Sequence, residues 1–185
     1  MSDPNSDLNR RSLEAFPSWL RTLQADVRLL TRVIEDTESG DAVREALAAA
    51  LNYLFKSVDL IADGIEDLGY MDDAFVLRVA ASAIDLEAVN DAAQRAELER
   101  LAADAELIRE FMGADYARLE TYVSGLGSLV VCGRSAADIA RDPEVRQAFL
   151  GELSGWAGQY VTPSFEHDEK NLVKLRAFLG TKLAG

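Results

Sequence analysis

The chain has 185 residues, of which 49% are hydrophobic, so it can bury about two-thirds of its unfolded surface as one domain. Its net charge of −13 opposes binding to nucleic acid phosphates and anionic lipid headgroups, and it favours neutral or basic protein partners, or cations. One cysteine and one histidine exclude an intramolecular disulfide and the ordinary Cys/His zinc sites, so we expect a soluble protein of the reducing cytoplasm.

The first 40 residues divide into a tail and a helix. Residues 1–12 have no apolar core, so they are not a secretory signal, and we expect a disordered tail ahead of one helical domain at 13–185. Apolar side chains spaced by three and four from Leu20 to Ile34 predict an amphipathic helix over residues 17–36. Pro17 suits the first turn of this helix.

A second helix is predicted after the SerGlyAsp sequence at 39–41. Its apolar face is dominated by alanine, which allows close helix contacts, so we expect it at the centre of the fold. Five aspartates and two glycines follow between residues 58 and 73. Asp72 is expected to cap a third helix, with Asp73 in the first turn, where the helix dipole favours a negative charge.

Together with Tyr53, this segment resembles the signature of the YkvA-like domain family over about residues 43–83. The motif positions fall on Tyr53, Asp59, Ile61, Asp63, Gly69, Asp72 and Asp73. Ser57, Ala62 and Glu66 stand where the family has prolines, so their amides can donate and we expect the second helix to continue through Ser57. The resemblance implies a helical fold but no established biochemical activity.

Later helices are predicted over residues 86–112, 115–124 and 165–182, and one that starts at Pro143 after Asp142. Ser135 and Asp138 have the spacing of a capping box. Residues 128–132 could form a strand, but without a second strand signal we favour a buried loop or helical turn. No uncharged run is longer than residues 121–133, which are too few and too polar to span a membrane. The predicted fold is an all-α single-domain bundle of six or seven helices, with a central helical hairpin around the Asp-rich turn.

The aspartates are the main candidates for chemistry. Carboxylate oxygens of Asp59, Asp63, Asp72 and Asp73 could meet around Mg²⁺ or Ca²⁺. A calcium-binding helix-loop-helix does not fit, because Ile61 and Tyr70 would occupy positions that need oxygen ligands. In the simpler interpretation, which we favour, the aspartates cap helices and bond nearby amides in turns.

Three other features have both a functional and a structural interpretation. Cys132 and His167 could pair as nucleophile and base, but neither lies in a catalytic motif, and a buried cysteine is typically a small hydrophobe. The GlyLeuGly sequence at 125–127 indicates a tight turn, not a phosphate loop. Trp19 could be an exposed contact, but we favour its packing against the tail or a neighbouring helix.

Aromatic residues of the carboxy-terminal helices could form an association surface or cover the alanine-rich centre. These residues are Phe149, Trp156, Tyr160, Phe165 and Phe178. We favour a non-enzymatic protein-interaction or adaptor module, bound to a protein partner or to itself, with no nucleic acid or membrane partner. The alternative is a divalent-cation sensor or metal-dependent hydrolase that uses the Asp cluster.

Overall fold

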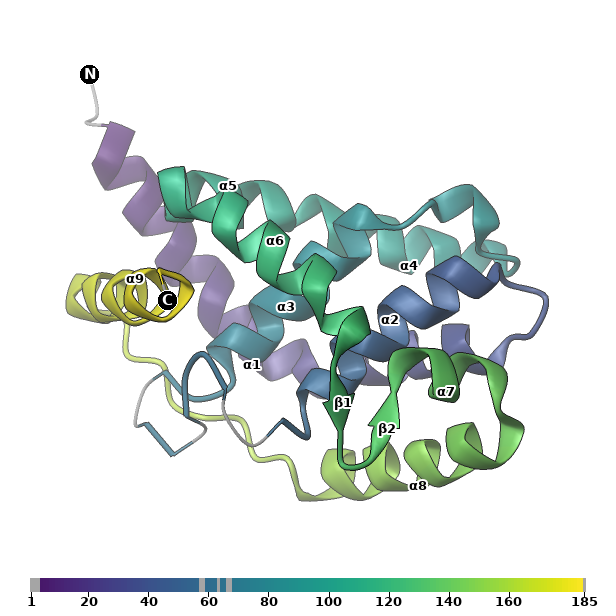
Figure 1. Ribbon diagram of the computed structural model, residues 1–185. Coiled ribbons are helices and arrows are strands. Elements are labelled where there is room, and N and C mark those ends of the chain that lie inside the picture. Colours follow the sequence, from purple (N-terminus) through teal and green to yellow (C-terminus); the bar gives the residue numbers. More distant parts are fainter. Residues whose placement is uncertain (1–3, 57–58, 63, 66–67, 185) are drawn as a thin grey trace.

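Helices provide nearly all the regular structure of residues 4–56, 59–62, 64–65 and 68–184, which are the residues that this computed structural model describes (Figure 1). In chain order the α-helices are α1 (Pro4–Glu35), α2 (Asp41–Tyr53), α3 (Met71–Ala83), α4 (Ala92–Ala103), α5 (Ala105–Met112), α6 (Tyr116–Gly125), α7 (Ala136–Arg141), α8 (Pro143–Gln159) and α9 (Glu169–Leu183). Short 3-10 turns are η1 (Leu86–Ala88), η2 (Gly113–Asp115) and η3 (Leu126–Ser128). The buried side chains form one core cluster, so the prediction of an all-α single-domain bundle is confirmed.

Helix α1 is longer at its amino end than the sequence pattern indicated. It is already helical at Pro4, so the expectation of a disordered tail is wrong for the described residues of that segment, and Pro17 lies inside the helix. The ring of Phe16 packs at 5.1 Å from Phe75 and 4.9 Å from Phe111, measured between centroids. Burial of this aromatic cluster offsets the cost of an interior proline, about 3 kcal/mol.

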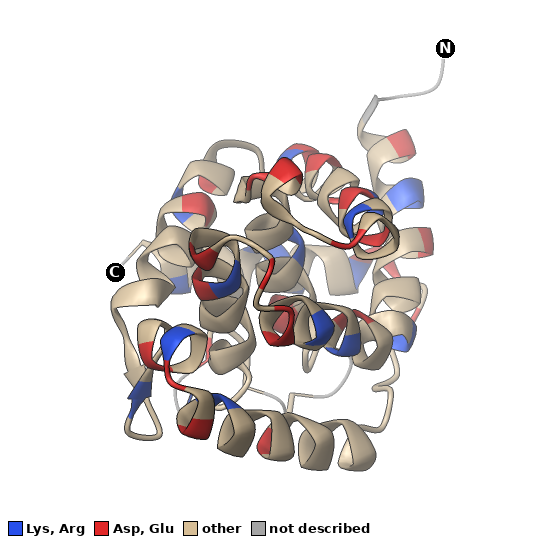
Figure 2. Ribbon diagram, turned by 90° about the vertical axis from the view of Figure 1, so that its right-hand side faces the viewer, with Lys and Arg blue, Asp and Glu red and all other residues tan. Residues whose placement is uncertain are grey.

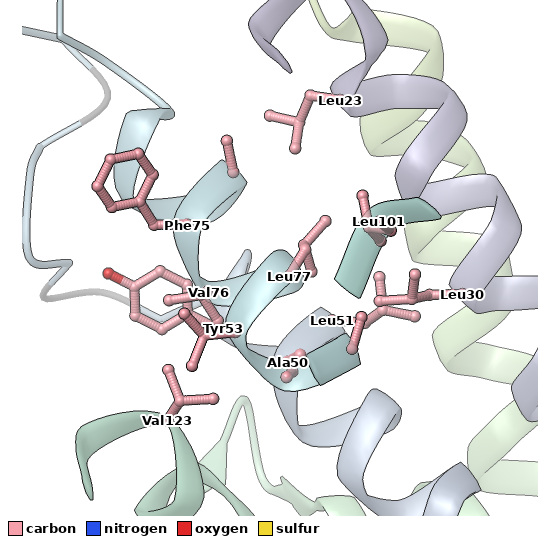
Figure 3. Close-up of a cluster of buried hydrophobic side chains, with 14 of the residues drawn as sticks. Leu23, Leu30, Ala50, Leu51, Tyr53, Phe75, Val76, Leu77, Leu101 and Val123 are labelled. Atoms are coloured by element: carbon pink, nitrogen blue, oxygen red, sulfur yellow. The ribbon is translucent and has the colours of Figure 1, made fainter. Parts of the chain in front are cut away.

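Helices α2 and α3 lie at the centre of the bundle. Every residue of α3 from Met71 to Ala81 is buried, and α2 packs against α1, α3 and α7. Figure 3 shows side chains of both helices in one cluster, with Leu51 of α2 on the side of Leu30 of α1 and Val76 of α3 on the side of Val123 of α6. A helix that is buried on all sides needs small residues for close packing, and the alanines of α2 and α3 supply them.

The second helix ends earlier than expected. It stops at Tyr53, and the next amides bond three residues back, with Lys56 N donating to Tyr53 O over 2.9 Å. We expected this helix to continue through Ser57. The expectation is wrong for residues 54–56, and Ser57 itself lies outside the described residues. Outside the helix, the ammonium of Lys56 donates to the hydroxyl of Tyr122 at 2.6 Å and lies over its ring.

The single helix expected over 86–112 is divided into η1, α4 and α5. Asp91 caps α4 by accepting a hydrogen bond from Gln94 N at 2.8 Å. The chain turns again at Asp104, whose carboxylate accepts from the guanidinium of Arg78 at 3.0 Å. The expected helix is thus interrupted at a capping residue and at a tertiary contact. Neither can be recognised from the spacing of apolar residues.

Residues 130–135 form a small antiparallel ribbon of β1 (Val130–Val131) and β2 (Arg134–Ser135), so the preference for a loop or helical turn is wrong. Cys132 and Gly133 make the two-residue turn, with φ of 50° and 79°. Each strand has only two residues, too few for an alternating pattern in the sequence. The ribbon is fixed by Arg134, which donates to Glu152 of α8 at 2.7 Å.

Two of the local signals for helix starts are confirmed. Ser135 and Asp138 exchange both bonds of a capping box ahead of α7. Asp142 accepts hydrogen bonds from the first amides of α8, with Pro143 as its first residue. The last helix, α9, begins at Glu169, four residues later than expected.

Charged residues are spread over the helices (Figure 2). In the described part of the chain, no helix has the length and apolar content required to cross a membrane.

Candidate functional site

The motif segment between α2 and α3 is held by one tyrosine and one aspartate. The hydroxyl of Tyr53 donates to Asp72 Oδ2 at 2.5 Å and accepts from Leu60 N at 2.8 Å. The same Asp72 oxygen accepts from Ile61 N at 3.0 Å. Tyr53 and Asp72 are both buried, so these bonds form out of contact with water. Tyr53 and Asp72 therefore act as a clamp on the backbone of the loop between the helices.

Asp72 does not have the capping role expected from the sequence. The residue before α3 is Tyr70, with φ of 62° and no side-chain cap bond, and Asp72 is the second residue of the helix. Its carboxylate turns toward α2 instead, because it is the acceptor for the Tyr53 hydroxyl. Asp73 lies in the first turn, as predicted.

The four candidate metal ligands are only partly brought together. Asp72 and Asp73 are buried at the start of α3, and Asp59 is half-buried in the loop. Asp63 lies outside the described residues. Among the residues that are described, no group of three or more His, Cys, Asp or Glu side chains is placed to hold a metal ion. The Mg²⁺ or Ca²⁺ site stays a prediction.

Cys132 and His167 are both exposed, and the Cys132 thiol contacts the carbonyl of Phe55 at 3.7 Å. The expectation of a buried cysteine is therefore wrong, because the ribbon turn places it at the surface. The GlyLeuGly sequence ends α6 and opens η3, so the predicted turn is confirmed.

Arg78, near the middle of α3, is completely buried, which the sequence analysis missed. Its guanidinium donates to Asp26 Oδ2 at 3.1 Å and to Asp104 Oδ2 at 3.0 Å, and it lies 4.5 Å from the ring of Trp19. Burial lowers the pKa of Arg78, while the two carboxylates act in the opposite direction. The one sequence signal was an arginine in the otherwise apolar run from Ala74 to Ala81.

Trp19 is buried in this cluster, so its interpretation as an exposed contact is wrong.

The carboxy-terminal aromatic residues are divided between the core and the surface. Phe149 is buried, and the half-buried Tyr160 stacks on Trp156 and donates to Leu20 O of α1 at 2.7 Å. Phe178 is exposed.

A groove opens between α2, α3 and α6, with a volume of about 680 Å³. Its apolar lining consists largely of small side chains: Ala42, Ala46, Ala49, Val79, Ala80, Ala83, Val123 and Gly127. Three charged residues border it, Glu45, Arg109 and Glu120, and the guanidinium of Arg109 lies 3.6 Å from Glu120. Alanine side chains are short, so those on the outer side of α2 and α3 do not fill this space.

Buried tyrosines give the protein a testable response to alkaline pH. Burial, followed by the charge of Asp72, raises the pKa of Tyr53 above its usual range, and burial does the same for Tyr160. A phenol with a raised folded pKa contributes stability that is complete below its unfolded pKa, about 10, and is lost as pH rises above it. We expect the free energy of unfolding to fall above about pH 10 by about 1.4 kcal/mol per pH unit for each such tyrosine.

Denaturant titrations at a series of alkaline pH values would measure this slope. Tyr53→Phe should make it less steep, because the variant has one fewer phenol that ionises only on unfolding. An equal slope in the variant and the wild type would contradict the assignment.

Comparison with known families gives a match to the central hairpin of the chain. A family model described as "Protein of unknown function (DUF1232)" matches residues 44–78, which covers most of α2, the loop and the first half of α3. No curated protein and no solved structure matches the chain. The match includes both partners of the Tyr53–Asp72 clamp, and this chain is therefore similar to that family over its central hairpin.

Proposed function

We propose that this protein is a non-enzymatic interaction module that binds a partner helix in the groove between α2, α3 and α6. The groove is the observation that supports this function. Its volume of about 680 Å³ falls within the usual range for ligand-binding clefts, about 300–1,000 Å³.

The groove is suited to a helix because of the size of its lining side chains. Ala46 and Ala49 lie one turn apart on α2, and Ala80 and Ala83 lie one turn apart on α3. Small residues on two neighbouring helices let a third helix come close and insert larger apolar side chains. Such helix-in-groove binding places partner anchors at spacings of three, four and seven residues.

The floor of the groove belongs to α2 and α3, the two helices of the central hairpin. The Tyr53–Asp72 clamp joins these helices across their connecting loop. A preformed groove binds with a smaller ordering cost than one that must be assembled. In this proposal the clamp has a structural role, and recognition occurs on the outer surfaces of α2, α3 and α6.

Site-specific photo-crosslinking in cell extract tests this function. A photoreactive amino acid at Ala46, an exposed groove position, should give a discrete adduct. The same amino acid at Ala103, an exposed alanine of α4 outside the groove lining, should not. Filling the groove with Ala83→Trp should remove the adduct at position 46 and leave the melting temperature close to that of the wild type, since Ala83 is exposed.

Adducts at both positions, or at neither, would contradict the proposal. Melting temperatures measured with Mg²⁺ and Ca²⁺ test the cation alternative in parallel. A site in the folded state would raise the melting temperature as the cation concentration increases. We expect no such rise.

A further inference from the structure

The exposed face of α9 differs from the rest of this acidic chain. Three of the four lysines in the sequence, Lys170, Lys174 and Lys182, lie on this face, and none of them makes an ion pair with a described residue. The helix as a whole carries four cationic side chains and one carboxylate, in a chain with a net charge of −13. The outer face of α9 is therefore a cationic surface on an anionic molecule.

The same face carries two large apolar side chains. Val173 is 65% exposed and Phe178 is 37% exposed, and both are among the few large hydrophobic residues that the described surface leaves open. Residues spaced by four lie in rows along a helix, so Phe178 is in the row of the three lysines and Val173 starts the adjacent row. The opposite face is fully used, because Leu172, Leu175 and Leu179 are buried in the core.

We propose that the partner of the α9 face is a second copy of this chain, whose α2–α3–α6 groove receives it. This inference rests on the proposed function of the groove and names its occupant. Size is one reason, because Val173 and Phe178 project from α9 and the groove is lined mainly by alanines. Large side chains on the inserted helix would fill the space that the small ones leave.

Charge is the second reason. Two carboxylates, Glu45 and Glu120, border the groove together with one guanidinium, that of Arg109. Arg109 is within 3.6 Å of Glu106 and Glu120, and Arg141 lies 3.0 Å from Glu45. Three carboxylates therefore share two guanidiniums at this edge, and a lysine of α9 would balance the remaining negative charge while the apolar side chains enter the groove. Complementary charges of this kind fix the orientation of a partner and exclude alternatives.

The positions of the two surfaces allow a closed dimer. Helix α6 contacts α9 and also contributes Glu120, Thr121 and Ser124 to the groove. Figure 1 shows α9 at the edge of the molecule, with α6 between it and α2. Because the surfaces flank the same helix, two copies related by a twofold axis can each donate α9 and each receive it.

Sedimentation velocity of the full chain over about 1 to 100 μM measures the association directly. The wild type should shift from monomer to dimer in this range. Raising the ionic strength from about 0.1 M to 1 M, which shortens the screening length from about 10 Å to about 3 Å, should weaken the dimer. Lys174→Glu and Phe178→Ser should each weaken it about tenfold or more, as expected for central contacts.

Two controls and one rescue make this test specific. Arg28→Glu changes the net charge equally on the exposed surface of α1, and Val161→Ser removes an apolar side chain that is 80% exposed outside both surfaces. Neither should change the dissociation constant. Lys174→Glu combined with Glu120→Lys in one chain should recover dimerisation, because the charges are exchanged across the contact. Thermal unfolding of each variant confirms that it is folded.

A monomer at every concentration, or a dimer insensitive to the α9 variants, would overturn the inference. If the chain stays monomeric and a different protein still crosslinks at Ala46, the groove function stands and only its occupant is wrong. Salt-sensitive binding of the monomeric wild type, but not of Lys174→Glu, to phosphatidylserine vesicles would assign the α9 face to a membrane and reject the dimer.

Discussion

Replacing Asp26 with alanine is expected to lower the free energy of unfolding by about 3–5 kcal/mol. Asp26 is 2% exposed and accepts hydrogen bonds from Thr22 at 3.0 Å and from Arg78 at 3.1 Å. Without it, the completely buried guanidinium of Arg78 keeps its charge and loses one of its two carboxylate partners. Chemical denaturation at neutral pH would measure the loss.

The matched control is an exposed ion pair that also joins α1 to another helix. Arg32 of α1 and Glu97 of α4 are 3.4 Å apart and about half exposed, so Glu97→Ala should cost less than about 1 kcal/mol. Combining Asp26→Leu with Arg78→Met should cost less than Asp26→Ala, because apolar groups then replace both charges. A loss for Asp26→Ala as small as that for Glu97→Ala would show that Arg78 does not depend on this carboxylate.

The second large effect is expected at the clamp between α2 and α3. Asp72→Ala should lower the free energy of unfolding by about 3 kcal/mol, because it removes the acceptor of two buried hydrogen bonds, from Tyr53 and from Ile61 N. The comparison is Asp91→Ala, which removes an ordinary helix cap and should cost about 1 kcal/mol.

A double-mutant cycle with Tyr53→Phe isolates the clamp. Removing the hydroxyl alone takes one hydrogen-bond partner from Leu60 N and one from Asp72, which still accepts from Ile61 N. The two single losses should therefore not add, and the coupling energy should exceed about 1 kcal/mol. If Asp72→Ala and Asp91→Ala have equal effects, Asp72 stabilises the helix end only and the clamp contributes nothing measurable.

The sequence by itself determined the fold class and most helix positions, because these depend on local patterns. The stripe from Leu20 to Ile34 has the helical period, and that segment is helical and largely buried. The capping box at Ser135 and the start at Pro143 depend on residues within three positions of each other. Signals of this length are readable without knowledge of distant contacts.

Helix ends were less predictable where packing competes with propensity. Pro17 favours a helix start, yet α1 runs through it because Phe16 is held in an aromatic cluster with residues from two other helices. The helix expected over 86–112 is also divided at a residue with a distant partner, since Asp104, between α4 and α5, binds Arg78. In both cases the deciding partner is far away in the sequence.

Only the tertiary structure decided the roles of the charged residues and the position of the candidate surfaces. Asp72 has the sequence position of a cap, but a hydroxyl 19 residues away makes it a clamp. Asp26 and Arg78 are 52 residues apart, and no local pattern pairs them. The groove and the open face of α9 exist because other helices cover some faces and not others. That choice depends on how the whole chain packs, which periodicity and composition do not encode.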